Sequence, residues 1–298
     1  MASSLTRRAP KPAKDRPQPT HTSATYVYGI VDGERPPRVP RTLPTLPGAG
    51  HPRVLAVSEG RWLLVADVPL TEYGDTALPE RLRNARWVAA CGLAHHDLVS
   101  RFVRSHAVVP MTPFTIFASD ERAIRQAHGA AKRLNATVRL VQHRGEWSFR
   151  VYAPKSARRA PVASAAAAAP ARKTPPTTGT IFLQRKLEFR KAAADAAQAT
   201  RAATETAYAE LEALADRAHR RPETESLSGS ALSGSGLAGS GLLLDAAFLL
   251  PLTQARAFAT TARALARRLT TLGLEVSFSG PWPAYSFIES SRVSRGGA

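Results

Sequence analysis

The sequence predicts an α+β protein of two domains, and three features of its 298 residues point to this class. At about 150 residues per domain, the length gives an expectation of two domains. Strand-type and helix-type runs alternate along most of the chain, which is typical of helices packed on one face of a sheet. Stretches rich in Pro and Ala, or in Gly and Ser, interrupt these runs and predict linkers. We expect domains at 24–118 and 119–289, linkers at 154–178 and 222–241, and disordered tails at 1–23 and 290–298.

The first predicted domain opens with a strand at 26–31, a β-branched and aromatic run that stops at Asp32-Gly33. Strands at 54–58 and 61–68 flank Glu59-Gly60, a pattern that predicts a tight hairpin. A helix is expected over 79–105, where apolar residues recur every three or four positions. The members of that stripe are Leu82, Ala85, Ala89, Leu93, His96, Val99 and Val103.

Short strands at 108–110 and 116–117 follow, and Ser119 is a suitable N-cap for a helix at 120–134. The second predicted domain then starts with a hairpin across Arg144-Gly145. This order of elements, with helices on one face of a sheet, predicts a modified ferredoxin-like sandwich. Its expected elements are strands at 137–143 and 146–153, a helix at 181–220, a strand at 242–250, a helix at 252–272 ended by Gly273, and a strand at 274–279.

The net charge of +18 raises the hypothesis of a nucleic-acid-binding protein, because phosphate neutralisation needs clustered Lys and Arg. Ten of these charges lie in two short stretches, 1–20 and 150–175, that are otherwise typical of tails and linkers. Apart from Tyr152, base-stacking aromatic residues are not interleaved with them. Nucleic-acid binding is therefore the alternative hypothesis and not the leading one.

The sequence contains few candidate residues for catalytic chemistry. Cys91 is the single cysteine, which excludes an internal disulfide and a cysteine-based zinc site and fits a reducing cytoplasm. Cys91 and His95 have the i, i+4 spacing of a possible nucleophile pair, but no third orienting group is evident. A mid-helix cysteine is more often a small buried residue, and His96 fits a packed core histidine better than a metal ligand. We therefore predict no catalytic, metal-binding or cofactor-binding residues.

Membrane insertion is not expected either. The first twenty residues lack the apolar core of a signal peptide. The longest apolar stretch, Leu242–Leu252, contains Asp245 and is shorter than the roughly 20 residues that a membrane span needs.

Residues 279–287, here called the aromatic segment, are more distinctive. Pro281 and Pro283 bracket Trp282, and Tyr285 and Phe287 follow. Because proline fixes φ, the segment should present its aromatic rings in a set geometry. Two interpretations stay open: these rings close the core, or they form a docking surface for a partner.

With these residues in hand, the chain resembles the gas vesicle protein GvpL/GvpF family. The resemblance spans most of 25–288 outside the two low-complexity stretches, and it rests on the order and spacing of short motifs. These are Tyr26-Val-Tyr-Gly-Ile-Val31, Trp87, His96-Asp-Leu-Val99, Val109-Pro-Met111, Thr115-Ile-Phe117, Gly145-Glu-Trp147, Arg150-Val151, Gly179, Phe182-Leu183, Lys186, Gly280-Pro-Trp-Pro283 and Tyr285-Ser-Phe287. One departure is that Thr112-Pro113 stands where the family usually has a basic residue.

The resemblance implies a non-catalytic accessory protein of gas vesicle formation, located in the cytoplasm or on the vesicle, with two α+β domains of which the second is ferredoxin-like. Its implied partners are the small, very hydrophobic major shell protein and other accessory proteins of the vesicle. We expect Trp282, Tyr285 and Phe287, together with exposed strand edges, to contribute to shell-protein binding. The alternatives are a basic nucleic-acid binder and an enzyme on a ferredoxin-like scaffold, which fold alone never excludes.

Overall fold

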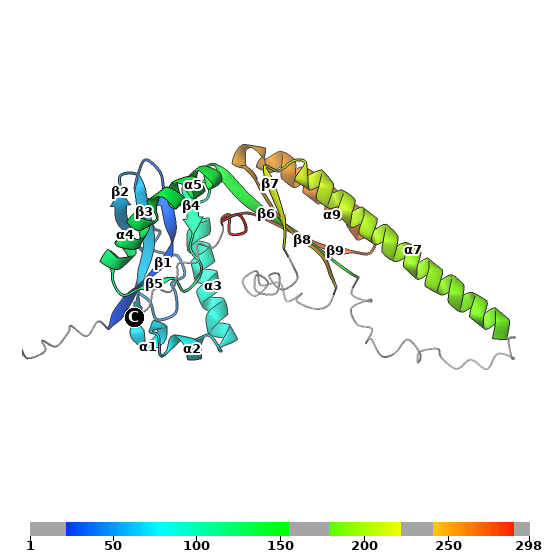
Figure 1. The fold of residues 1–298 in the computed structure, drawn as a ribbon, viewed down its shortest axis with the longest axis horizontal. Helices are drawn as coiled ribbons and strands as arrows, with labels where there is room; N and C mark the ends of the chain where they lie inside the picture. Colours follow the sequence, from blue (N-terminus) through cyan, green and yellow to red (C-terminus); the bar gives the residue numbers. More distant parts are fainter. Residues whose placement is uncertain (1–21, 155–178, 222–240, 289–298) are drawn as a thin grey trace, which may run out of the picture.

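The structure, a computed structural model, describes residues 22–154, 179–221 and 241–288. The strands of these residues form two antiparallel sheets with helices packed on them (Figure 1). The protein is therefore α+β, as the sequence predicts. The predicted tails and linkers lie almost wholly outside the described residues, although Ser23 already belongs to the first strand. The domain boundaries stay predictions.

The first sheet has the strand order β2-β3-β1-β4, with β5 also paired to β1. Its strands are β1 (Ser23–Asp32), β2 (Arg53–Ser58), β3 (Arg61–Pro69), β4 (Ala107–Pro110) and β5 (Ile116–Phe117). The predicted hairpin between β2 and β3 is confirmed. Its turn places Gly60 at a φ of 70°, a left-handed conformation that glycine adopts without a steric penalty.

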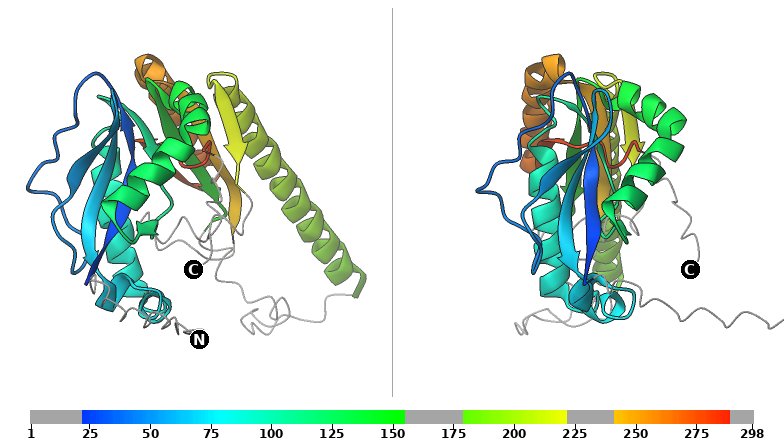
Figure 2. Two further views of the ribbon diagram at one scale, coloured as in Figure 1. Left: turned by 60° about the vertical axis from the view of Figure 1, so that its left-hand side comes forward. Right: turned by 90° about the vertical axis from the view of Figure 1, so that its left-hand side faces the viewer.

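Helices cover both faces of this sheet (Figure 2). Helix α3 (Ala85–Ser100) packs on one face, and α4 (Asp120–Gly129) and α5 (Ala131–Val141) pack on the other. Two short helices, α1 (Leu70–Tyr73) and α2 (Leu78–Arg81), connect β3 to α3. Strand β1 is consequently buried on both sides, which explains its nearly continuous apolar sequence.

The single helix predicted over 79–105 is wrong. Asn84 is extended, and its side chain accepts a hydrogen bond from the backbone N–H of Trp87, so a new helix begins there. The predicted stripe is also out of phase, since Leu82 and Leu93 are 46% and 48% exposed. The buried side of α3 is instead formed by Trp87, Cys91, Ala94, His95, Leu98 and Val99.

The hairpin predicted from 137–143 and 146–153 is also wrong, because 131–141 is the helix α5. The β-branched residues Thr137 and Val138 suggested a strand. Leu134, Val138 and Val141 recur at helical spacing, however, and all three are buried against the first sheet. The helix predicted at 120–134 is consequently two helices that meet at Ala130.

The second sheet has the strand order β7-β8-β6-β9. Its chain order is β6 (Arg144–Tyr152), α7 (Gly179–Glu212), β7 (Arg217–Arg220), β8 (Leu242–Pro251), η1 (Leu252–Gln254), α9 (Ala255–Thr271) and β9 (Glu275–Trp282). A β-α-β-β-α-β chain with this antiparallel strand order has ferredoxin-like topology. Three predicted boundaries change: α7 ends before 220 and is followed by β7, α9 begins after a 3-10 turn, and β9 continues to Trp282.

The two faces of the second sheet have different neighbours. Helices α7 and α9 cover one face, where Phe248, Phe258 and Leu211 lie in a shared core. On the other face, Leu249 and Ala284 pack with residues of α4 and α5 in a core that also contains β1 and β3 (Figure 2). The two sheets are thus joined by a common apolar core.

Candidate partner-binding surfaces

The structure places the aromatic segment at the junction of the two sheets. The Trp282 ring lies 4.7 Å from the ring of His96 on α3, and the Tyr285 ring stacks on the same histidine at 6.0 Å. Phe287 packs against the core that joins the sheets. All three predicted residues are half-buried, and the contacts described here are with their own chain. Whether they also bind a partner stays a prediction.

The two neighbouring histidines have different environments. His95, not His96, is the core histidine: it is 1% exposed, and its Nδ1 lies 2.9 Å from the Tyr26 hydroxyl. Burial lowers the pKa of His95 to about 4, so its imidazole is neutral near pH 7. His96 is half-buried and forms the α3 side of the junction. The sequence pattern predicted His96 as the core histidine, because the predicted apolar stripe included His96 and not His95.

Cys91 is fully buried in the core of the first sheet. Its Sγ lies 3.5 Å from the Tyr73 hydroxyl, and burial raises the pKa of the thiol. A buried thiol with a raised pKa is a weak nucleophile, so the interpretation of Cys91 as a packing residue fits its environment. Within the described residues, no group of three or more His, Cys, Asp or Glu side chains is placed to hold a metal ion.

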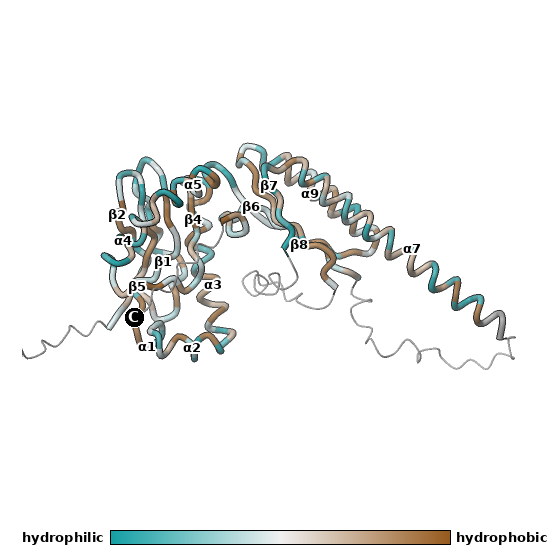
Figure 3. Tube along the Cα trace, viewed as in Figure 1, coloured by the Kyte–Doolittle hydropathy of each residue, from teal (hydrophilic) through white to brown (hydrophobic). Residues whose placement is uncertain are grey.

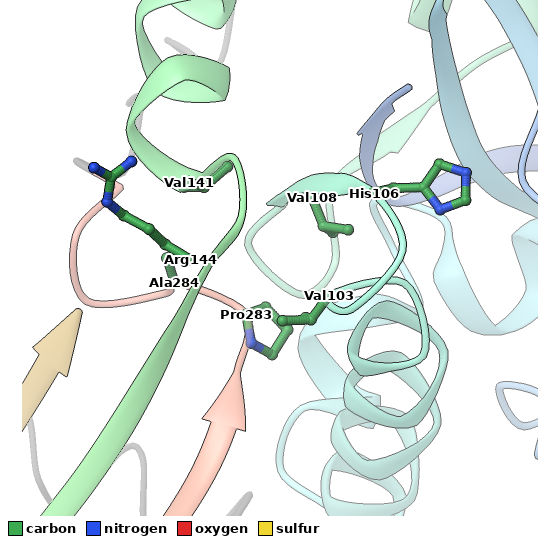
Figure 4. A pocket seen from close by; sticks show the side chains of 7 residues that line it. All are labelled: Val103, His106, Val108, Val141, Arg144, Pro283 and Ala284. Carbon is green, nitrogen blue, oxygen red and sulfur yellow. The ribbon is translucent and has the colours of Figure 1, made fainter. Parts of the chain in front are cut away.

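A narrow hollow lies at the junction, between the end of α3 and the end of β9 (Figure 4). Its lining residues are Val103, His106, Val108, Val141, Arg144, Pro283 and Ala284. The hollow leaves no space for a water-sized molecule. It is therefore a seam between packed elements and not a ligand pocket.

A buried ionic network holds residues 283–288 to the second sheet. Arg221 donates hydrogen bonds to Glu146 at 2.6 Å and to Asp245 at 2.9 Å. Ser286 also binds Glu146, through its backbone N–H at 2.9 Å and its hydroxyl at 2.9 Å. Arg150, one of the cations of the basic stretch 150–175, is itself paired with Asp245 at 3.1 Å. Burial raises the pKa of Glu146, and the neighbouring Arg221 opposes that rise.

The outer strand β9 offers a free edge. It pairs with β6 on one side, and no other strand among the described residues pairs with its second side. Val276 and Phe278 face the core under α9, while Trp282 marks the end of the strand beside the junction. An outer strand with unpaired backbone groups is a surface to which another strand can be added.

The fold and its surfaces define a class: an α+β protein with a ferredoxin-like second sheet and with outer edges suited to protein contacts. The chain belongs to the gas vesicle synthesis protein GvpL/GvpF family, whose profile matches residues 24–289. The family resemblance noted in the sequence is thereby confirmed.

Individual relatives agree with this assignment. Gas vesicle protein L of Streptomyces sp. (strain CB03234) is 24% identical over 221 residues, which cover 74% of this chain and 77% of the relative. The crystal structure of the gas vesicle protein GvpF from Anabaena sp. PCC7120 is similar with a TM-score of 0.55 at 14% identity, covering 89% of this chain and 95% of that one. The crystal structure of gas vesicle protein GvpF from Microcystis aeruginosa is similar with a TM-score of 0.53 at 12% identity, covering 89% of this chain and 98% of that one. At these identities the structural likeness shows the fold.

These relatives are all gas vesicle proteins, so they give no support to the nucleic-acid alternative. None of the helices in the described part of the chain is long and apolar enough to cross a membrane.

Proposed function

We propose that the protein is a non-catalytic accessory factor that binds the major hydrophobic shell protein in the cytoplasm or at the vesicle and assists its assembly or nucleation. Family membership supports the vesicle role. The observation that carries shell-protein binding is the position of β9, an outer strand whose second edge is free among the described strands. Other accessory proteins of the vesicle are further proposed partners.

The physical reason lies in the properties of an apolar shell subunit. A protein that assembles into a gas-facing wall exposes apolar surface and unpaired strand edges before assembly, and both promote aggregation. Edge addition to β9 would pair the backbone of such a subunit. In this proposal the exposed parts of Trp282, Tyr285 and Phe287 contact its apolar side chains, while their buried parts keep the segment in place.

The test is to block the edge of β9 without disturbing the fold. Ser277 lies opposite Arg150 in the β6–β9 pair, so an aspartate there gains an opposite charge across the strands while placing a charge on the outer strand. Ser58→Asp is the matched control, because Ser58 lies on the outer strand β2 of the other sheet and opposite Arg61.

Mixed with purified shell protein, wild type and Ser58→Asp should suppress light scattering, and Ser277→Asp should not. All three should share one circular dichroism spectrum. Full suppression by a folded Ser277→Asp variant would contradict binding at β9.

Replacing both Trp282 and Tyr285 by alanine should also abolish shell-protein capture while the circular dichroism spectrum stays native. Loss of the native spectrum would assign the two rings to junction packing alone. Deletion of the gene, followed by microscopy, tests the vesicle role itself.

A further inference from the structure

Helix α7 extends well beyond the sheet on which it packs (Figures 1 and 2). Residues 183–199 are all exposed, a length of about 25 Å at 1.5 Å per residue. We call this stretch the free half of α7. It includes Phe189, an apolar side chain that is 77% exposed.

Specific contacts mark where the packed half of α7 begins. Arg268 of α9 pairs with Glu210 at 3.3 Å, and Arg220, the last residue of β7, pairs with Glu205 at 2.5 Å. Thr204 is buried, and Thr200 is the first half-buried residue after the exposed stretch 183–199. Beyond this turn neither α9 nor the sheet covers the helix.

The free half continues the same apolar side of α7. Phe189 precedes the buried Ala207 by 18 residues, and Ala193 precedes the buried Leu211 by 18, which is about five turns at 3.6 residues per turn. These side chains therefore point in the direction that faces the core further along the helix. Leu183 and Leu187, one turn apart, form a second exposed apolar pair on another side of the helix. Figure 3 shows that both apolar and polar residues occur along this part of α7.

The charges around these apolar residues are mostly of one sign. Residues 183–191 contain four cations and one anion, a net charge of +3. The cations are Arg185, Lys186, Arg190 and Lys191, and the anion is Glu188. All five side chains are exposed.

We propose that the free half of α7 is a docking surface for an amphipathic helix of another protein, one whose apolar stripe is flanked by acidic residues. The apolar side of α7 already packs against a helix, α9, in its covered half, and the partner helix would continue that layer. Acidic flanks would meet the cations of the free half. This surface is separate from β9, so the inference does not depend on shell-protein binding there.

Two other occupants fit less well. A second copy of the free half would bring its own cations against these, which is unfavourable. A membrane surface needs a large apolar area, yet residues 192–199 contribute mainly alanines, whose small side chains favour close approach of a helix instead.

The test uses the full chain and a synthetic peptide of about 18 residues, five helical turns, with leucines on one side and glutamates flanking them. A second peptide carries lysines in place of the glutamates. The paired change Phe189→Ser with Ala193→Ser removes the apolar contact on the side of α7 that faces the core further along the helix, and Arg185→Glu with Arg190→Glu reverses the charge. The control is Leu93→Ser with Leu272→Ser, two leucines of 48% and 52% exposure on other elements.

We expect each α7 variant to weaken binding of the glutamate peptide by about tenfold or more, as measured by fluorescence anisotropy, while the control stays within about twofold. The lysine peptide should bind at least about tenfold more weakly than the glutamate peptide. The proposal is overturned if both peptides bind equally or if neither α7 variant weakens binding. Stronger binding to phosphatidylserine vesicles than to the glutamate peptide would also overturn it. So would a dimer of the wild-type chain that dissociates in the α7 variants, as measured by sedimentation.

Discussion

Arg220 and Arg221 are neighbours in the chain, yet their ion pairs lie in different surroundings. The Arg221 pairs with Glu146 and Asp245 are almost fully buried, whereas the Arg220 pair with Glu205 is exposed. Removing one partner of a buried pair leaves an uncompensated charge in the interior, whereas an exposed pair adds little to stability. The two adjacent arginines therefore form a matched comparison.

We expect Arg221→Ala to lower the free energy of unfolding by about 3 kcal/mol or more, because Arg221 is the cation that pairs with the buried Glu146 among the described residues. Arg220→Ala should cost about 1 kcal/mol or less. Urea denaturation followed by circular dichroism measures both. Equal losses in the two variants would show that the buried network does not stabilise the fold in this way.

Single-residue environments were only partly predictable from the sequence. The buried state of Cys91 follows from its residue type, and the structure agrees. Which of His95 and His96 is buried depends on where the helix begins, and that is set by the cap at Asn84. The partners of Arg150 and Arg221 come from 24 to 95 residues away in the chain, so local pattern gives no access to them.

At the scale of elements, glycine positions show how closely β1 and β4 approach one another. A Cβ on Gly29 would lie 2.9 Å from the backbone oxygen of Val109, whereas a Cβ on Gly129, in the last turn of α4, would meet nothing within 4 Å. We expect Gly29→Ala to destabilise the protein by about 1–3 kcal/mol through this clash. Gly129→Ala should stabilise it by up to about 1 kcal/mol, because alanine favours a helix.

Thermal denaturation of the two glycine variants beside wild type measures these opposite effects. A Gly29→Ala variant as stable as wild type would mean that β1 and β4 can separate without cost.

Elements with strong local signals were predictable. The β2–β3 hairpin has its glycine turn, and α9 has a regular apolar stripe with Gly273 behind it at a φ of 82°. Elements whose signal depends on tertiary contacts were not. Helix α5 contains the β-branched residues Thr137, Val138 and Val141, and it is a helix because one of its sides packs on the first sheet. Strand β7 forms because it pairs with β8.

At the scale of the whole molecule, the sequence predicts two α+β units but not how they join. The junction combines residues of α3, α5, β8 and the aromatic segment, which are distant in the chain. The aromatic segment left two interpretations open, core closure and partner docking. The structure shows its rings packed at this junction, and partner docking stays a proposal.

The shared core predicts that the two sheets unfold together. Leu249 of the second sheet is fully buried in a core with Val138 of α5. Leu249→Ala should leave a cavity there and cost about 2–5 kcal/mol. The chain has four tryptophans, of which Trp87 lies in the first half and Trp147 in the second. Variants that keep only Trp87 or only Trp147 of the four therefore report each half separately by fluorescence.

Both fluorescence reports should show one common denaturant midpoint, and Leu249→Ala should lower it equally in the two, because a cooperative unit has a single transition. Leu272→Ala, at an exposed position, is the control and should change the free energy of unfolding by no more than about 0.5 kcal/mol with either fluorescence probe. A fall confined to the Trp147 midpoint would mean that the halves unfold independently. In that case the contacts at the junction would hold two separate units in place without coupling their stability.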